Sequence, residues 1–135
     1  MIKRIYIISG TLLITLLFSC GNSETPDLTF FLSKEWKMTS VFINGEEQDI
    51  DISSYRLILN SDLTFQRIQL NNETDEGTWS LANGNNQLEL ISTANGLEEY
   101  LIVELQFRLL ELQVIQGSDK VGATEFRYVL EPVRP

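Results

Sequence analysis

Residues 55–70 of this 135-residue chain read YRLILNSDLTFQRIQL, two short apolar runs that flank the polar pair Ser61-Asp62. In the first run Tyr55, Leu57 and Leu59 occupy every second position, and a period of two places such residues on one face of a β-strand. A short polar turn between two runs of this kind is typical of a β-hairpin. The stretch therefore predicts two antiparallel strands joined by a tight turn.

The same pattern continues along the chain on both sides of this hairpin. We expect eight strands, at residues 35–43, 55–60, 63–70, 77–81, 87–92, 100–105, 109–115 and 125–131. Turn residues such as Asn44-Gly45, Asn83-Gly84 and Asn95-Gly96 separate them. Strands at this spacing predict an all-β sandwich or barrel, and the short connections favour a meander of neighbouring antiparallel strands.

Two stretches depart from regular alternation. Phe65 and Ile68 are out of phase with each other, which predicts a β-bulge near Gln66-Arg67. The polar segment 46–54 has room for one short helical turn. No part of the chain after residue 20 shows a helical period over three turns, so we expect little helix.

Closure of the sheet is the remaining question of architecture. An open sheet of eight strands would expose two long edges, whereas a closed barrel has none. Closure needs the last strand, 125–131, beside the first, 35–43. We therefore predict a small eight-stranded antiparallel up-and-down barrel, and a two-sheet sandwich is the alternative that the sequence leaves open.

The N-terminal segment resembles a bacterial lipoprotein signal. Lys3 and Arg4 precede an apolar run over residues 5–18, and Ser19-Cys20-Gly21 follows it. The resemblance implies removal of residues 1–19 and attachment of lipid, palmitate among its acyl chains, to Cys20. An ordinary secretory signal or an N-terminal membrane anchor is the alternative. We expect a signal peptide at 1–19, the lipidated Cys20 and a tether at 20–29, and one barrel domain at 30–135.

Composition limits the chemistry of this domain. The chain has no histidine and a single cysteine, Cys20, so we expect no nucleophile system built on histidine, no histidine or thiolate metal site, no cofactor and no enzymatic activity. Loss of Lys3 and Arg4 with the signal would shift the net charge from −9 to −11. A charge of this sign disfavours nucleic acid as a partner. The acidic loops at 46–51 and 73–76 lack the spacing of an EF-hand, so we expect them to be solvated.

Several motifs together are similar to the lipocalin-like (calycin-type) domains of bacterial envelope lipoproteins. They are Trp36, Asn44-Gly45, and the segments 55–59, 63–65, 77–81, 88–90, 100–102 and 110–112. The resemblance covers about residues 30–133. It implies a small barrel that has room for an internal ligand. By resemblance to known sorting rules, Gly21-Asn22 after the cysteine favours the outer membrane over the inner one.

Eight residues on the alternating faces are candidates for the barrel interior or a ligand site: Trp36, Met38, Tyr55, Leu57, Trp79, Tyr100, Phe126 and Tyr128. They either line a cavity or pack into a solid core. The first case predicts a lipid-anchored envelope protein that binds a small hydrophobic ligand and contacts the membrane through Cys20. The alternative is a solid barrel that contacts a protein partner in the envelope.

Overall fold

The computed structural model describes residues 27–116 and 123–134. The expected signal segment, Cys20 and most of the tether lie outside these residues. Within them, no helix has the length and apolar character needed to cross a membrane.

One short helix and nine strands make up the described part of the chain. They are α1 (Leu28–Leu32), β1 (Glu35–Ile43), β2 (Glu46–Glu47), β3 (Arg56–Leu59), β4 (Thr64–Ile68), β5 (Thr74–Ala82), β6 (Gln87–Ser92), β7 (Gly96–Gln106), β8 (Leu109–Val114) and β9 (Phe126–Pro132). All eight expected strands are present, with ends that shift by a few residues. Helix α1 and the two-residue β2 were not predicted, and β2 occupies the stretch where one helical turn was considered.

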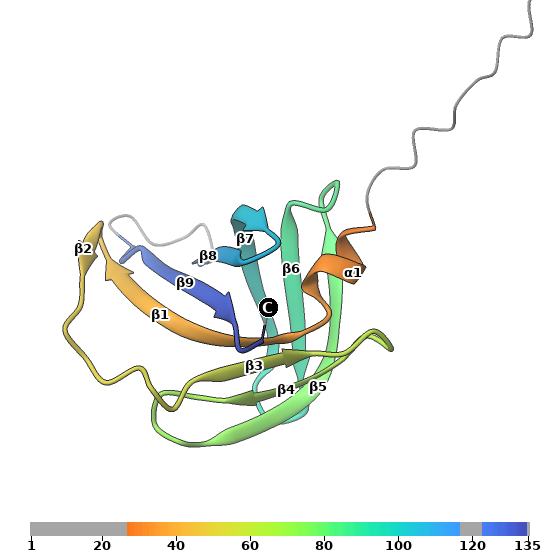
Figure 1. Ribbon diagram of the computed structural model, residues 1–135, viewed down its shortest axis with the longest axis horizontal. Helices are drawn as coiled ribbons and strands as arrows, with labels where there is room; N and C mark the ends of the chain where they lie inside the picture. The colour runs from red at the N-terminus through yellow and green to blue at the C-terminus, as the bar shows by residue number, and fades with distance from the viewer. Residues whose placement is uncertain (1–26, 117–122, 135) are drawn as a thin grey trace, which may run out of the picture.

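The strands form a closed antiparallel barrel. Strands β1, β3, β4, β5, β6, β7, β8 and β9 pair in that order, and β9 returns to pair with β1. Figure 1 shows β9, in blue, lying along β1, in orange. Closure by the last strand against the first confirms the predicted barrel and removes the sandwich alternative.

The bulge predicted near Gln66-Arg67 is wrong. Strand β4 pairs with β3 and β5 without any shift of register, from Leu59 opposite Phe65 to Arg56 opposite Ile68. The register shifts lie instead in β1, between Met38 and Ser40, and in β7. The inward residues of β4 are Phe65 and Arg67, both buried, so strict alternation holds and places a charged side chain inside the barrel.

The two ends of the barrel differ. At the end where β1 begins, which we call the closed end, Leu32 of α1 is fully buried and its carbonyl oxygen accepts a 3.0 Å hydrogen bond from Trp36 Nε1. Asp27 caps α1 by accepting a hydrogen bond from the Thr29 amide. The β3–β4 and β7–β8 turns lie at this end, where the Leu59 amide and the Phe107 carbonyl contact Lys34.

The opposite end, which we call the open end, carries the β1–β3, β4–β5 and β6–β7 connections. The core begins at the closed end and fills the adjoining part of the barrel. Its largest fully buried side chains are Trp36, Phe65, Leu32, Leu57, Leu59, Leu88, Leu90, Leu110, Leu112 and Leu130. Among the described residues, no helix covers the open end as α1 covers the closed end. A pocket lies at the open end.

Candidate functional site

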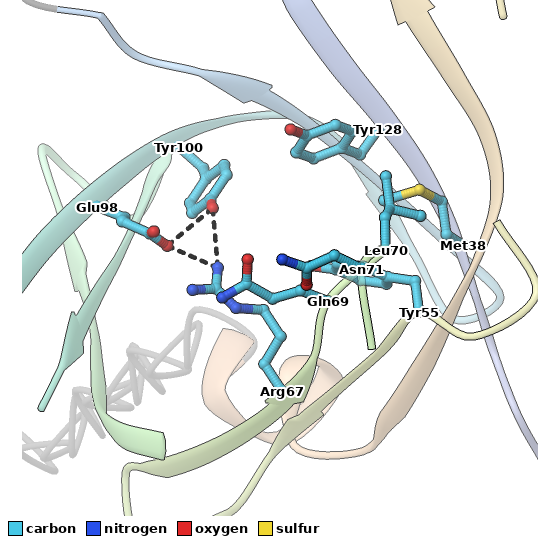
Figure 2. Close-up of a pocket in the computed structure, with 9 residues that line it drawn as sticks. All are labelled: Met38, Tyr55, Arg67, Gln69, Leu70, Asn71, Glu98, Tyr100 and Tyr128. Carbon is cyan, nitrogen blue, oxygen red and sulfur yellow. Dashed lines mark hydrogen bonds and ion pairs between the residues drawn. The ribbon is translucent and has the colours of Figure 1, made fainter. Parts of the chain in front are cut away.

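The candidate site is a pocket inside the open end of the barrel. Its volume is about 370 Å³, within the range of about 300–1,000 Å³ that small-molecule sites occupy. Its lining comes from β1, the residue before β3, β4, the β4–β5 connection, β7 and β9. The lining residues are Met38, Tyr55, Arg67, Gln69, Leu70, Asn71, Glu98, Tyr100 and Tyr128. Figure 2 shows Glu98 and Tyr100 on one side of the pocket, with Met38 and Leu70 on the other.

A buried ion pair forms the base of the polar side. Arg67 Nε donates to Asp75 Oδ1 at 2.9 Å, and Arg67 Nη2 donates to Asp75 Oδ2 at 2.6 Å. The two side chains are only 5% and 2% exposed. This two-point contact fixes the orientation of the guanidinium plane, as parallel hydrogen bonds between arginine and a carboxylate do.

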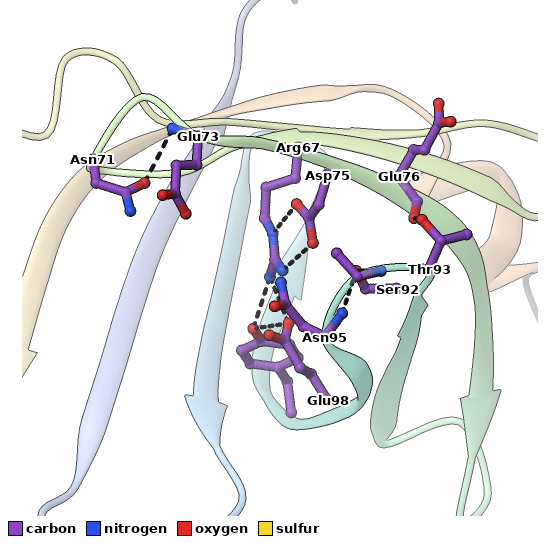
Figure 3. Close-up of polar contacts among 11 residues, drawn as sticks. Arg67, Asn71, Glu73, Asp75, Glu76, Ser92, Thr93, Asn95 and Glu98 are labelled. Carbon is purple, nitrogen blue, oxygen red and sulfur yellow. Dashed lines mark hydrogen bonds and ion pairs between the residues drawn. The ribbon is translucent and has the colours of Figure 1, made fainter.

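The remaining guanidinium nitrogen contacts the pocket lining. Arg67 Nη1 donates to Glu98 Oε2 at 2.6 Å and to the Tyr100 hydroxyl at 3.2 Å. The Tyr100 hydroxyl in turn donates to Glu98 Oε2 at 3.1 Å. Figure 3 shows Arg67 lying between Asp75 and Glu98. Arg67, Glu98 and Tyr100 are thus each hydrogen-bonded to the other two. Asp75 binds the opposite side of the guanidinium and holds it in place.

Burial and ion pairing shift the pKa values of Arg67 and Asp75 in opposite directions. Burial alone would raise the pKa of Asp75, but the hydrogen bonds and positive charge of Arg67 outweigh it and hold that pKa below its usual range. Burial alone would lower the pKa of Arg67, but the Asp75 and Glu98 carboxylates raise it overall. Both groups are therefore charged at neutral pH, and the cluster holds two carboxyl groups, those of Asp75 and Glu98, for one guanidinium.

The local sequence explains how these groups meet. Arg67 lies two residues after the inward Phe65, and antiparallel pairing places Asp75 of β5 directly opposite Arg67. Glu98 and Tyr100 are two residues apart on β7, so their side chains share one face of the strand. Cross-strand register, rather than proximity in sequence, therefore assembles the cluster.

Tyrosines form the aromatic part of the lining. The ring centroids of Tyr100 and Tyr128 are 6.4 Å apart, and Tyr55, just before β3, is 7% exposed. Burial raises the pKa of Tyr55, Tyr100 and Tyr128, so all three hydroxyls are protonated at neutral pH. Each can donate one hydrogen bond and accept others. The pocket thus combines aromatic rings with hydroxyl, amide and charged groups.

The eight residues expected in the interior fall into separate groups. Four of them line the pocket: Met38, Tyr55, Tyr100 and Tyr128. Trp36, Leu57 and Trp79 are buried in the core outside the pocket lining, and Trp79 Nε1 donates to the Asn60 carbonyl at 2.9 Å. Phe126 is half-buried opposite Ile43 and does not line the pocket. Cys20 lies outside the described residues.

Sequence reasoning missed Arg67, Gln69, Asn71 and Glu98. For Arg67 and Gln69 a signal was present, because both continue the alternation that begins at Phe65. The apolar Ile68 belongs to the opposite phase of the alternation, and for that reason a bulge was predicted. No local signal distinguishes Glu98 or Asn71 from the other polar residues of the chain, since only the folded barrel brings them to the pocket.

The acidic segments at 46–51 and 73–76 show no metal-ligating geometry. The expectation that 73–76 is a solvated loop is wrong for Asp75, which is buried in β5 and paired with Arg67. Across residues 27–116 and 123–134, no group of three or more histidine, cysteine, aspartate or glutamate side chains is arranged to hold a metal ion. Glu46, Glu47, Asp49 and Asp51 are all exposed. Asp51 Oδ1 accepts hydrogen bonds from the Ser53 amide and hydroxyl, a local turn contact.

Comparison with known proteins shows the fold. No family model matches the sequence, and no curated protein matches it. The structure is similar to that of a lipocalin-like protein from Bacteroides uniformis ATCC 8492, with 13% identity and a TM-score of 0.55, over 76% of this chain and 98% of that one. An uncharacterized protein from Bacteroides eggerthii DSM 20697 has 12% identity and a TM-score of 0.52, over 75% of this chain and 98% of its own. The chain therefore has a lipocalin-like fold.

Proposed function

We propose that this protein is a lipid-anchored component of the bacterial cell envelope that binds a small molecule in the open-end pocket. The observation that supports this most directly is the pocket itself. One end of the barrel is filled by Trp36 and capped by α1, whereas the other end holds a hollow of about 370 Å³ with charged and aromatic walls. A buried charged network adds little net stability to a barrel, and here it borders the hollow.

The lining indicates the character of the ligand. Met38, Leu70 and the tyrosine rings supply apolar surface, and Arg67, Gln69, Asn71 and Glu98 supply polar groups. A wholly apolar ligand would leave these polar groups without water or a partner, which is unfavourable. We therefore propose a small amphipathic molecule in place of the purely hydrophobic ligand expected from the sequence.

The anchor is proposed from the N-terminal sequence. The order of basic residues, apolar run and Ser19-Cys20-Gly21 supports lipid on Cys20 and a location at the outer membrane. A tether of a few residues would then connect the lipid to α1 at the closed end. Such an arrangement leaves the open end free of the attachment point.

The Cys20→Ser variant tests the anchor. Intact mass analysis of the membrane-extracted protein should show acyl mass on the wild type and none on the variant, and the variant should leave the detergent phase on phase separation. If the variant retains the acyl mass, lipidation at Cys20 is wrong.

Occlusion of the pocket tests ligand binding. Leu70 is a half-buried lining residue, so Leu70→Trp should fill the hollow and abolish saturable fluorescence of the neutral probe N-phenyl-1-naphthylamine. Leu101→Trp is the matched control, because Leu101 is exposed on the outside of β7. Binding that survives Leu70→Trp as well as Leu101→Trp would contradict a site in this pocket.

One observation favours the alternative of an interaction protein. Ile91, Leu97, Leu101 and Val103 are exposed large apolar side chains of β6 and β7, and Ile91 lies opposite Leu97 in the sheet. Exposed apolar surface of this kind marks contact sites for other proteins. Under this reading, Leu97→Ser would weaken recovery of a partner after chemical crosslinking in the envelope, and no probe would bind the pocket.

A further inference from the structure

The charge of the pocket limits what its ligand can be. Arg67 is the one basic residue in the lining, and its donors are already directed to Asp75, Glu98 and Tyr100. The carboxylates of Asp75 and Glu98 therefore outnumber the single guanidinium of Arg67. An anionic ligand would meet a net negative cluster whose only positive group is already neutralised, and this is unfavourable.

Glu98 has an oxygen available for a ligand. Its Oε2 accepts hydrogen bonds from Arg67 and Tyr100, whereas its Oε1 accepts none from the residues that the structure describes. The Glu98 side chain is 31% exposed, compared with 2% for Asp75. Glu98 is therefore the carboxylate of the cluster that a bound molecule can reach.

A second hollow adjoins the first at this residue. It measures about 450 Å³ and shares Glu98, Tyr100 and Tyr128 with the first. Glu99 adds a second carboxylate, and the rest of its described lining is aliphatic, with no basic side chain. Glu98 thus lies where a polar head group would sit, with apolar and aromatic surface on both sides.

Tyrosine rings at this position favour positive charge. The faces of aromatic rings attract cations within about 6 Å of their centres, and a carboxylate beside such rings strengthens the attraction. Tyr100 and Tyr128, with ring centroids 6.4 Å apart, both border the two hollows next to Glu98. The exposed acidic residues of the β1–β3 connection, Glu46, Glu47, Asp49 and Asp51, belong to the same end of the barrel and would steer cations toward it.

We infer that the ligand of this pocket is an organic cation, a protonated amine or quaternary ammonium group on a small apolar body, whose charged head contacts Glu98 between Tyr100 and Tyr128. This inference rests on the proposed ligand-binding function and specifies the chemical class of the ligand. The aromatic and aliphatic lining accommodates the body, and the buried Arg67–Asp75 pair holds the Glu98 carboxylate in place.

Three molecules that share one indole ring test this inference: tryptamine, tryptophol and indole-3-propionate, which are cationic, neutral and anionic. Isothermal titration calorimetry of the full-length protein in a nonionic detergent gives the three dissociation constants. We expect tryptamine to bind at least about tenfold more tightly than tryptophol, and indole-3-propionate to bind most weakly.

The Glu98→Gln variant isolates the carboxylate. It should weaken tryptamine binding about tenfold and leave tryptophol binding within about twofold. Glu104→Gln is the matched control, because Glu104 is exposed farther along β7 and does not line either hollow; it should change neither constant. If Glu98→Gln does not fold, the ranking of the three ligands on the wild type decides alone.

The outcomes separate this inference from the function on which it rests. If tryptophol or indole-3-propionate binds as tightly as tryptamine or more tightly, the inference of a cationic ligand is wrong, but the proposed ligand-binding function stands. Binding of N-phenyl-1-naphthylamine without binding of any indole has the same meaning. If neither the indoles nor N-phenyl-1-naphthylamine binds, both the cation and the proposed ligand-binding function are overturned.

Discussion

Arg67 and Asp75 show how a charged pair can occupy the interior of a small barrel. Taking two charges out of water is costly, and their attraction offsets that cost only when the geometry is good and the other polar atoms are paired. Here two hydrogen bonds of 2.9 and 2.6 Å join them, and Glu98 and Tyr100 complete the contacts of the guanidinium. Because such a pair adds little net stability, its presence at the pocket supports a role in binding.

Removing either partner alone should be strongly destabilising. Arg67→Met and Asp75→Leu should each lower the free energy of unfolding by about 3–5 kcal/mol, because the first leaves the buried Asp75 without its partner and the second leaves Arg67 Nε and Nη2 without theirs. The double variant should lose less than the sum of the two. Urea unfolding followed by circular dichroism measures all three.

An exposed ion pair provides the comparison. Arg56 Nε and Glu35 Oε1 lie 3.7 Å apart, and the two side chains are 31% and 44% exposed. Glu35→Gln should therefore change the free energy of unfolding by about 1 kcal/mol or less. Strictly additive losses in the double variant of Arg67 and Asp75 would show that the two side chains do not stabilise each other.

Acid should destabilise the fold through Asp75. Its pKa is lowered in the folded protein, so its contribution is present above its unfolded pKa of about 3.9 and is lost as the pH falls through the folded value. The wild type should therefore lose free energy of unfolding below about pH 4 more steeply than Asp75→Asn does. Urea unfolding between neutral pH and pH 3 gives both slopes, and parallel slopes would assign the acid sensitivity to other carboxylates.

At the scale of elements, local sequence explains most strand ends and turns. Asn44 and Gly45 have φ values of 50° and 83°, and Asn83 and Gly84 have values of 51° and 70°. These left-handed conformations suit asparagine and glycine and match the twist of a hairpin. The turns predicted at these dipeptides are therefore present for a local reason. Helix α1 has only five residues, too few for a helical period to be detected.

Gly77 of β5 is required by a contact between strands. A Cβ atom at this position would lie 1.9 Å from the carbonyl oxygen of Ile91 in β6. That neighbour is backbone, so it cannot turn aside as a side chain could. Glycine within a strand commonly marks such a close approach of another backbone.

Substitution of Gly77 should therefore disturb the β5–β6 pairing. Gly77→Ala should lower the free energy of unfolding by about 1–3 kcal/mol or more, because the added methyl group forces the strands apart. Ser80→Ala, which removes only a hydroxyl group elsewhere on β5, should cost less than about 1 kcal/mol. Thermal or urea unfolding compares them, and a Gly77→Ala protein as stable as the wild type would mean that β6 can shift without cost.

At the scale of the whole molecule, the solid core and the pocket occupy opposite ends of the barrel. The closed end is solid, with Trp36 and Trp79 at 0% and 2% exposure and each indole nitrogen donating to a backbone carbonyl. The open end contains the pocket, its tyrosines and the charged cluster. The two tryptophans were expected either to line a cavity or to fill the core, and the structure places them in the core.

This division predicts different effects of aromatic substitutions at the two ends. Trp36→Ala and Trp79→Ala should each lower the free energy of unfolding by about 3–5 kcal/mol, and the folded protein should keep the wild-type affinity for N-phenyl-1-naphthylamine. Tyr128→Leu should weaken that affinity at a smaller cost in stability, since Tyr128 is only half-buried. Urea unfolding and probe titration are the two measurements, and a tryptophan variant that stays folded but loses probe binding would contradict the division.

The sequence by itself determined the class of fold, because alternation and turn residues act over a few positions and each strand carries its own pattern. It also indicated closure, since an eight-stranded open sheet would leave two edges exposed. The lipidated Cys20 and the envelope location stay predictions from the N-terminal sequence. Only the tertiary structure decided which polar residues enter the barrel. Arg67 meets Asp75 through the β4–β5 register, and it meets Glu98 because β7 lies across the barrel from β4. Such contacts join residues up to 31 positions apart, and no local pattern specifies which carboxylate an inward arginine will reach.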